Sequence, residues 1–143
     1  MKKLMMILMM FVAVGVSGQN VVNNRTQYNL DQFVGDCLKE LKIDSISLDI
    51  IPYKGLIYGQ YKAMAYKGLL NYMISISNEI SSEYEAKKTI RHELKHISQL
   101  FNNELIQIDN KTVIFKGIKY RTTSIYHYED KWEVEARIFA DLY

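Results

Sequence analysis

The sequence predicts a small α+β domain, in which short strands and amphipathic helices follow one another along the chain. Between residues 82 and 102, apolar residues recur at steps of three and four, which indicates one face of a helix. Between residues 46 and 77, short stretches rich in Ile, Tyr, Met and Ala indicate strands. One Pro and seven Gly among 143 residues, with no internal repeat, fit one compact domain.

The first elements follow a polar segment, residues 20–30, which is expected to be a loose leader. The spacing of apolar residues predicts a helix over residues 31–41, and Asp31 could cap its start. Residues 46–50 alternate between apolar and polar side chains, as strands do, and Pro52 is expected to end that strand.

Two more strands are expected before the long helix, over residues 57–67 and 71–77, with a turn near Gly68. Gly117 is expected to break or bulge the chain after the long helix. The remaining expected elements are a hairpin of strands 104–108 and 112–115 that turns at Asp109-Asn110, a strand over 118–122 and a last helix over 130–142.

The long helix carries the clearest chemical signal. Ser82 and Glu85 have the spacing of a capping box, which marks a helix start. Its apolar stripe consists of Ala86, Ile90, Leu94, Ile97 and Phe101. On a different face lie His92 and His96, which are four residues apart and can therefore offer two imidazoles to one metal ion.

Glu93 completes an HExxH motif with these two histidines. It lies about 100° round the helix from the residue before it, so it cannot easily serve as a third ligand. Its carboxylate can instead reach a water molecule at the metal and act as general base. The motif therefore favours a zinc site with His92 and His96 as ligands.

Catalytic zinc usually takes three protein ligands, so a third is sought in the last helix. Glu133 shares one helical face with Ala136 and Ala140, and two alanines allow that face to approach another helix closely. We therefore prefer Glu133 as the third ligand over Glu135. The alternative for Glu133 is a capping box with Asp130.

With these residues in place, the chain resembles a small gluzincin, a zinc metallopeptidase with HExxH on one helix and a ligating glutamate on a later one. Residues 133–136 read Glu-Val-Glu-Ala and match the first four places of the Glu-x-x-Ala-Asp type pattern of that clan. Arg137 stands where the acid that supports the first histidine is common. The metzincin pattern is excluded, because Gln99 and Asn102 occupy the places of its Gly and third His.

The resemblance implies a small mixed sheet packed on the HExxH active-site helix, with the C-terminal helix carrying the third metal ligand. It also implies a Zn²⁺ cofactor and a peptide or protein substrate. An edge strand around residues 58–65 would bind the substrate by main-chain pairing. Hydrolysis of a peptide bond also needs a group that stabilises an oxyanion. His127 and Tyr126, just before the last helix, are the catalytic candidates for that role.

The N-terminus reads as a secretory signal peptide over residues 1–18. Two lysines precede an apolar run over residues 4–16, and the small residues before Gln19 suggest cleavage after Gly18. A secreted or periplasmic domain over residues 19–143 would follow, in which residues 19–45 could act as a leader. The alternative is an uncleaved N-terminal anchor; with cleavage, no stable membrane insertion is expected.

Removal of the two signal lysines leaves 16 basic and 16 acidic residues, so neither nucleic acid nor an anionic membrane is expected as a partner. Cys37 is the only cysteine, which excludes an intramolecular disulfide. It is expected in the core, with a cysteine switch over the metal as the remote alternative. The mature chain is expected to be a monomer.

Three functions compete at this point. The first is a secreted zinc peptidase in which Glu93 is the general base. The second is a zinc-binding or interaction domain without catalytic activity, and the third is a metal-free binding protein with an accidental motif. Glu93 beside both histidines favours the first, because only catalysis requires that carboxylate.

Overall fold

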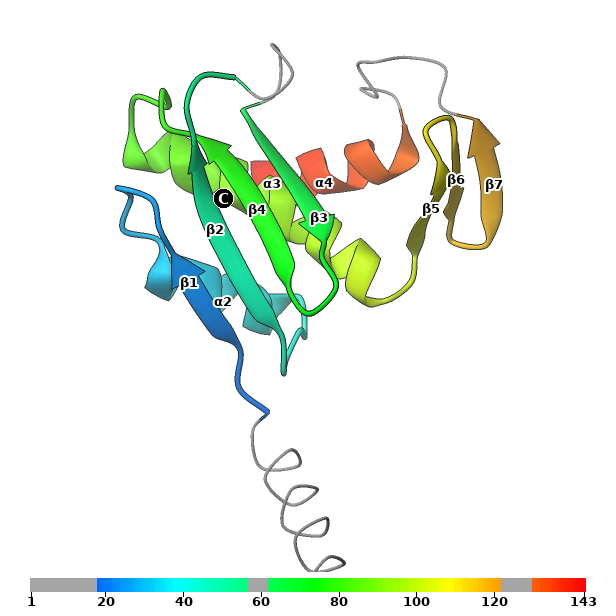
Figure 1. Cartoon of the computed structure of the whole chain (residues 1–143), viewed down its shortest axis with the longest axis horizontal. Coiled ribbons are helices and arrows are strands. Elements are labelled where there is room, and N and C mark those ends of the chain that lie inside the picture. The colour runs from blue at the N-terminus through cyan, green and yellow to red at the C-terminus, as the bar shows by residue number, and fades with distance from the viewer. Residues whose placement is uncertain (1–17, 57–61, 122–129) are drawn as a thin grey trace, which may run out of the picture.

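The computed structural model describes residues 18–56, 62–121 and 130–143, which form an α+β fold. Three helices and two sheets are present in these ranges (Figure 1). The helices are α2 (Asp31–Glu40), α3 (Glu83–Phe101) and α4 (Lys131–Asp141). The strands are β1 (Val21–Asn24), β2 (Ser47–Tyr53), β3 (Ala63–Lys67), β4 (Tyr72–Ser77), β5 (Leu105–Asp109), β6 (Thr112–Phe115) and β7 (Ile118–Arg121).

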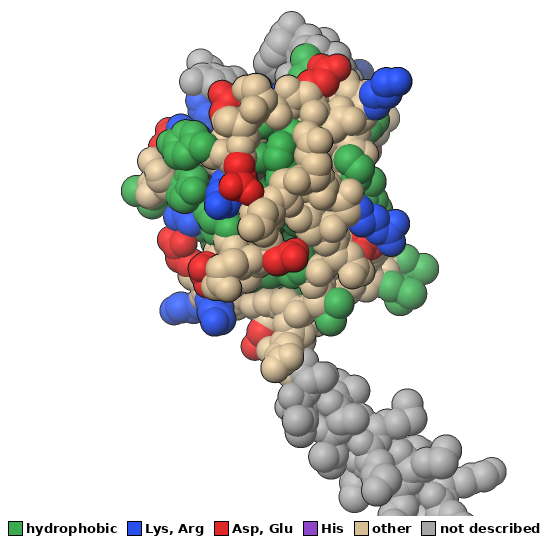
Figure 2. Space-filling model, turned by 90° about the vertical axis from the view of Figure 1, so that its left-hand side faces the viewer, with side chains coloured by type: hydrophobic (Ala, Val, Ile, Leu, Met, Phe, Trp, Pro, Cys, Tyr) green, Lys and Arg blue, Asp and Glu red, His purple; other side chains and the backbone are tan. Residues whose placement is uncertain are grey.

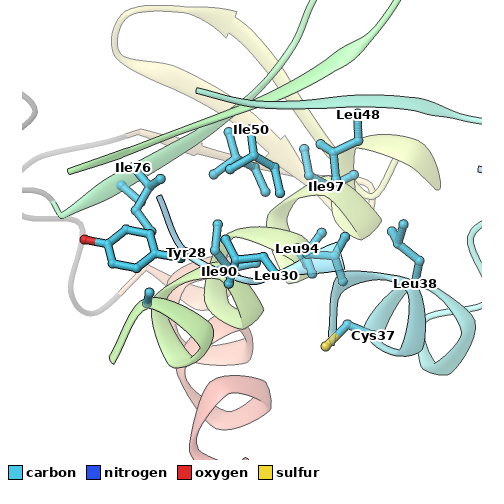
Figure 3. Close-up of a cluster of buried hydrophobic side chains, with 14 of the residues drawn as sticks. Tyr28, Leu30, Cys37, Leu38, Leu48, Ile50, Ile76, Ile90, Leu94 and Ile97 are labelled. Carbon is cyan, nitrogen blue, oxygen red and sulfur yellow. The ribbon is translucent and has the colours of Figure 1, made fainter. Parts of the chain in front are cut away.

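The larger sheet is mixed, and its strand order is β1-β2-β4-β3. Its first three strands are parallel, while β3 runs antiparallel to β4 and forms one edge. The helices lie on one face of this sheet (Figure 1). The predicted apolar stripe of α3 is buried there, where Ile90, Leu94 and Ile97 are 0% exposed. These side chains meet Leu48 and Ile50 of β2 in the main core (Figure 3).

The predicted loose leader over residues 20–30 is wrong in its first half, because residues 21–24 form the edge strand β1 beside β2. Asn20 adds side-chain hydrogen bonds to the backbone pairing that holds this strand. The Asn20 side chain donates to Ile43 O at 2.8 Å and accepts from Ile46 N at 3.1 Å. The segment is also anchored by Leu30, which is fully buried. The polar composition therefore predicted a loop, although polar side chains of this segment form hydrogen bonds to backbone groups and the segment is a strand.

Pro52 does not end β2, contrary to the prediction, because the strand continues to Tyr53. Ile50 O accepts from Arg25 N on the β1 side, whereas Tyr53 O accepts from Asn78 N on the β4 side. Since strand residues alternate in direction, Pro52 faces the β1 side, just beyond the end of β1. The missing N–H of Pro52 thus ends the pairing with β1 and leaves the pairing with β4 intact.

The second sheet is a three-stranded antiparallel meander, β5-β6-β7. Its first turn lies one residue later than predicted, since Asp109 pairs with Thr112 across Asn110-Lys111. Of the two expectations for Gly117, the break is confirmed and the bulge is not, because Gly117 forms the second turn with Lys116; the φ values are +81° for Gly117 and +50° for Lys116. Two positive φ values in a two-residue hairpin loop suit the right-handed twist of the flanking strands.

The starts of α3 and α2 are capped differently. Ser82 Oγ accepts from Glu85 N at 3.1 Å, which confirms Ser82 as the N-cap. Asp31 is not the cap of α2, because the N-cap position is Leu30, which makes no side-chain cap bond. Asp31 instead lies in the first turn, where its charge favours the positive end of the helix.

The expected signal peptide lies outside the described residues, apart from its last residue, Gly18. No helix in the described ranges is long and apolar enough to cross a membrane. Residues 19–45 belong to the sheet and the helical layer, through β1 and α2, and Val34 and Leu38 of α2 are fully buried.

Arg91 joins all three helices from the middle of α3. Its guanidinium bonds to Glu40 of α2 at 2.7 and 2.9 Å, and its Nε donates to Phe139 O of α4 at 2.7 Å. It also stacks 3.7 Å from the centroid of the Phe139 ring. Because the Arg91 side chain is only 8% exposed, these partners are needed to offset its desolvation.

Replacing Arg91 by Met is therefore expected to lower the free energy of unfolding by about 2 kcal/mol, mainly through the lost bond to the Phe139 carbonyl and the lost stacking. The Glu40 contribution is discounted, since that side chain is 51% exposed. Lys88→Met is the control: it breaks an exposed ion pair with Asp141 and should cost at most about 1 kcal/mol. Equal losses for both variants in urea unfolding would refute this role of Arg91.

Candidate metal centre

The packing of α4 against α3 brings together His92, His96 and Glu133, whose ligand atoms all lie within 4.8 Å of one another. The two imidazole Nε2 atoms are 3.2 Å apart. Glu133 places Oε2 at 3.1 Å from His92 Nε2 and Oε1 at 3.1 Å from His96 Nε2. Ala136 and Ala140 are buried, as expected for the close helix contact that delivers Glu133.

This donor set fits zinc. Ligand atoms of tetrahedral zinc lie about 3.3 Å apart when the Zn–N bonds are about 2.0–2.1 Å long. The three separations in the cluster, 3.1, 3.1 and 3.2 Å, are close to that value. Two imidazoles and one carboxylate are also a ligand set of catalytic zinc, which keeps a fourth position for water or substrate.

Glu93 lies beside the cluster and is buried, with 7% of its surface exposed. Burial raises the pKa of its carboxyl group, while the charges of His96 and His92 and a hydrogen bond from the Ala65 backbone oppose the rise. The bond to Ala65 joins Glu93 to the edge strand β3. A carboxylate whose pKa is raised is a stronger base, which suits it to accept a proton.

A cleft of about 660 Å³ opens over these residues. One wall is the edge strand β3, from Ala63 to Lys67, and the other is formed by the hairpin of β5 and β6. Its floor carries His92, Glu93 and His96 from α3 and Glu133 from α4. The face in Figure 2, which is the β1 side of Figure 1, shows no histidine among its coloured side chains. The cluster lies on the β3 side of the sheet, because it lines the same cleft as Ala63–Lys67.

The cluster is electrostatically coupled. Burial would lower the pKa of His96, but its hydrogen bond to Glu133 and the charges of Glu93 and Glu133 outweigh burial and raise that pKa to about 9. Burial alone would raise the pKa of Glu133, but the hydrogen bonds from His92 and His96 hold it far below the usual range. A proton on the imidazole thus occupies the place that a metal ion would take.

Not every predicted site residue joins the cluster. Glu135 points elsewhere and bonds to Gln99 at 2.9 Å and to Lys116. Asp130 makes no side-chain cap bond at the start of α4, so the capping-box alternative for Glu133 is wrong. His127 and Tyr126 lie outside the described residues.

Two parts of the chain are candidates for blocking the metal site: Cys37, as a cysteine switch, and the leader over residues 19–45. Neither lies at the site. Cys37 is buried between α2 and α3, with Sγ 3.6 Å from Arg91 Nη1, and it does not line the cleft. A cysteine switch is therefore wrong for this arrangement. Within the described ranges, residues 18–45 do not line the cleft either, and β1 lies at the opposite edge of the sheet from β3.

Sequence reasoning missed how strongly Gln99 is connected to the site. Its Oε1 lies 2.9 Å from His96 Nδ1, and its Nε2 donates to Trp132 O at 3.0 Å. The only sequence signal was that Gln99 shares the helical face of His92 and His96. The wall formed by the β5–β6 hairpin was also missed, because its docking depends on the contact of Phe115 with Trp132.

Comparisons of the chain with models of protein families, with curated proteins and with solved structures returned no match. The geometry of the site and the resemblance of its motif to gluzincins are therefore the basis for a functional proposal.

The raised pKa of His96 predicts a pH dependence for the metal-free protein. A histidine with a pKa of about 9 in the folded state and an ordinary value near 6.5 stabilises the fold fully below pH 6.5. That contribution is lost as the pH rises through about 9. In chelator-treated protein, the advantage in Tm of native protein over Glu133→Gln should therefore shrink by about 5 °C between pH 6.5 and 10. Parallel Tm profiles over this range would contradict the coupling.

Proposed function

We propose that this chain is a zinc-dependent peptidase that hydrolyses a peptide bond in the cleft between β3 and the β5–β6 hairpin. The observation that carries the proposal is the convergence of His92, His96 and Glu133 beside the buried carboxylate of Glu93. The first three side chains would hold Zn²⁺, which when bound supplies a Lewis acid for the scissile carbonyl and lowers the pKa of water.

Glu93 has the position of the general base. Its carboxylate takes a proton from the attacking water and passes it to the leaving amine. Burial raises the pKa of this carboxyl group, which makes its carboxylate a stronger base and favours the first of these transfers. The hydrogen bond from the Ala65 backbone orients the carboxylate and keeps it in the cleft beside the edge strand.

The edge strand β3 offers a means to bind an extended peptide. Lys62 O accepts from Ser77 N, and Gly68 N donates to Asn71 O, so even-numbered residues direct their backbone toward β4. The backbone groups of Ala63 and Lys67 consequently point to the outer edge of the sheet, as does the carbonyl of Ala65, whose N–H already donates to Glu93. A peptide in the cleft could pair with this edge, as the resemblance implies. The expected edge strand, residues 58–65, overlaps β3 only in its last part, since residues 57–61 are not described.

The competing proposal is a zinc-binding domain without catalytic activity. A small domain generally has little room for a substrate cleft, which would favour this competing proposal. The cleft of about 660 Å³ weakens that objection to an enzyme, and the burial of Glu93 beside the cluster favours catalysis. A domain that only held zinc would have no use for this carboxylate.

Export is part of the proposal, through the signal peptide over residues 1–18. Mass spectrometry of the secreted protein should find Gln19 as its N-terminal residue. A secreted form that retains Met1 would refute cleavage and favour the anchor.

The decisive variants are Glu93→Gln and Glu133→Ala. Native protein should hold one zinc per chain, and Glu93→Gln should hold the same amount but cleave peptides about 10²–10⁴-fold more slowly, because the amide cannot accept the proton. Glu133→Ala removes a ligand, so zinc content and cleavage should fall together. Glu85→Gln is the control, since Glu85 is an exposed residue of the same helix that pairs with Lys62 outside the cleft.

The assay is zinc content by metal analysis and cleavage of a mixed peptide library, measured for the four proteins in parallel. Cleavage by Glu93→Gln at the native rate would mean that Glu93 is not the base, and the mechanism would be wrong. Tight zinc binding by a native protein that cleaves nothing would favour the non-catalytic domain instead.

A further inference from the structure

The hydrogen bonds of Gln99 define the orientation of its side-chain amide. Gln99 lies on α3, three residues after His96, and is 0% exposed. Its Nε2 donates to Trp132 O at 3.0 Å and to Glu135 Oε2 at 2.9 Å. A backbone carbonyl and a carboxylate can only accept, so both must face the amide nitrogen. The amide oxygen is thereby directed to His96 Nδ1, at 2.9 Å.

This orientation decides which nitrogen of His96 carries a hydrogen. The Gln99 oxygen can only accept, so His96 Nδ1 must be an N–H, in the neutral ring and in the charged ring alike. In the neutral ring the lone pair is then on Nε2. Nε2 is the atom that lies 3.1 Å from Glu133 and 3.2 Å from His92 Nε2. The amide thus presents the metal-binding nitrogen of His96 to the cluster.

The same side chain also holds the helix that supplies the third ligand. Trp132, whose carbonyl accepts from Gln99, is the residue before Glu133 in the first turn of α4. The second acceptor, Glu135, is held from its other side by Lys116 in the turn between β6 and β7. Through Gln99, His96 is therefore connected to the start of α4 and to the hairpin that forms one wall of the cleft.

We propose that Gln99 is a positioning residue of the metal centre, which holds His96 with Nε2 toward the metal and fixes the start of α4 for Glu133. This role rests on the zinc site of the proposed function. In gluzincins, which the motif resembles, an acid that supports the first histidine commonly stands at the place of Arg137; here a side chain of the same helix supports the second histidine. Groups that orient a metal-bound histidine through its other nitrogen typically contribute 10–100-fold to metal affinity or activity.

Two variants separate the two parts of this role. Gln99→Met keeps the approximate volume but removes the acceptor for His96 and the donor to Trp132. The double variant Gln99→Glu/Glu135→Gln exchanges the two groups at constant charge. Its new carboxylate can accept from His96 Nδ1, and its new amide can donate to that carboxylate and accept from Lys116, while Trp132 O alone loses its donor. Gln32→Met is the control, because Gln32 is exposed on α2 and bonds only to the neighbouring Asp36 within the described structure.

The first readout is the His96 Nδ1–H signal of the zinc-free protein in ¹⁵N–¹H NMR, which requires neither metal nor activity. Native protein, the double variant and Gln32→Met should show this hydrogen as slowly exchanging, whereas Gln99→Met should lose the protection. The second readout is zinc affinity by chelator competition. The dissociation constant should rise about 10–100-fold in Gln99→Met and stay within about threefold of native, or fall, in the double variant.

A protected Nδ1–H or a native zinc affinity in Gln99→Met would overturn the proposal. A double variant that behaves like Gln99→Met would overturn the positioning of His96 by Gln99, since the bond to Trp132 alone would then explain the effect. If Gln99→Met does not fold, the double variant decides, because protection of its Nδ1–H supports the role and loss of protection refutes it. A native protein that binds zinc but cleaves no peptide would refute the proposed peptidase activity. It would not affect the conclusion that Gln99 positions His96.

Discussion

The contact between α3 and α4 is the constraint on which the rest of the structure depends. Helix α3 is buried on two sides, with an apolar stripe against the sheet and a polar face against α4. Buried polar side chains need partners, and α4 supplies Glu133 for the histidines and the Trp132 and Phe139 carbonyls for Gln99 and Arg91. Ala136 and Ala140 allow the two helices to approach closely enough for these bonds. One helix pair therefore determines both the stability of the helical layer and the geometry of the site.

The same contact explains why the site is at the edge of the sheet and accessible. The polar face of α3 points past β3 rather than under the centre of the sheet, so the edge strand becomes a wall of the cleft. The hairpin forms the opposite wall because Phe115 and Tyr120 pack on Trp132, next to the third candidate ligand. The first turn of α4 thus holds three parts of the site in place: the β5–β6 hairpin, the Glu133 side chain and the Gln99 amide. A change in that turn would alter all three together.

The sequence was most informative for features that depend on residues close together in the chain. The long helix followed from the cap at Ser82 and from its apolar spacing, and helical geometry alone placed His92 and His96 on one face. The preference for Glu133 over Glu135 followed from the alanines on its face, because small side chains mark a helix contact. These inferences needed no knowledge of which element packs against which.

Interactions between distant segments were beyond that reasoning. The strand at residues 21–24 is held by Asn20, whose bonds to residues 43 and 46 cannot be read from a polar composition. Pro52 remains in its strand because it faces away from β4, so the pairing with β4 does not need its N–H. The connection of Gln99 to Trp132 and Glu135 exists only once α4 is docked. In each case the deciding partner is distant in sequence, so the pattern of nearby residues could not reveal it.

The central claim is that His92, His96 and Glu133 bind one zinc ion while Glu93 remains uncoordinated. The most direct measurement is anomalous X-ray diffraction at the zinc edge from crystals of the zinc-loaded protein. One anomalous peak is expected, bonded to Nε2 of both histidines and to the Glu133 carboxylate, with the Glu93 carboxylate outside bonding distance. No peak at this position, or a peak bonded to Glu93 in place of Glu133, would contradict it.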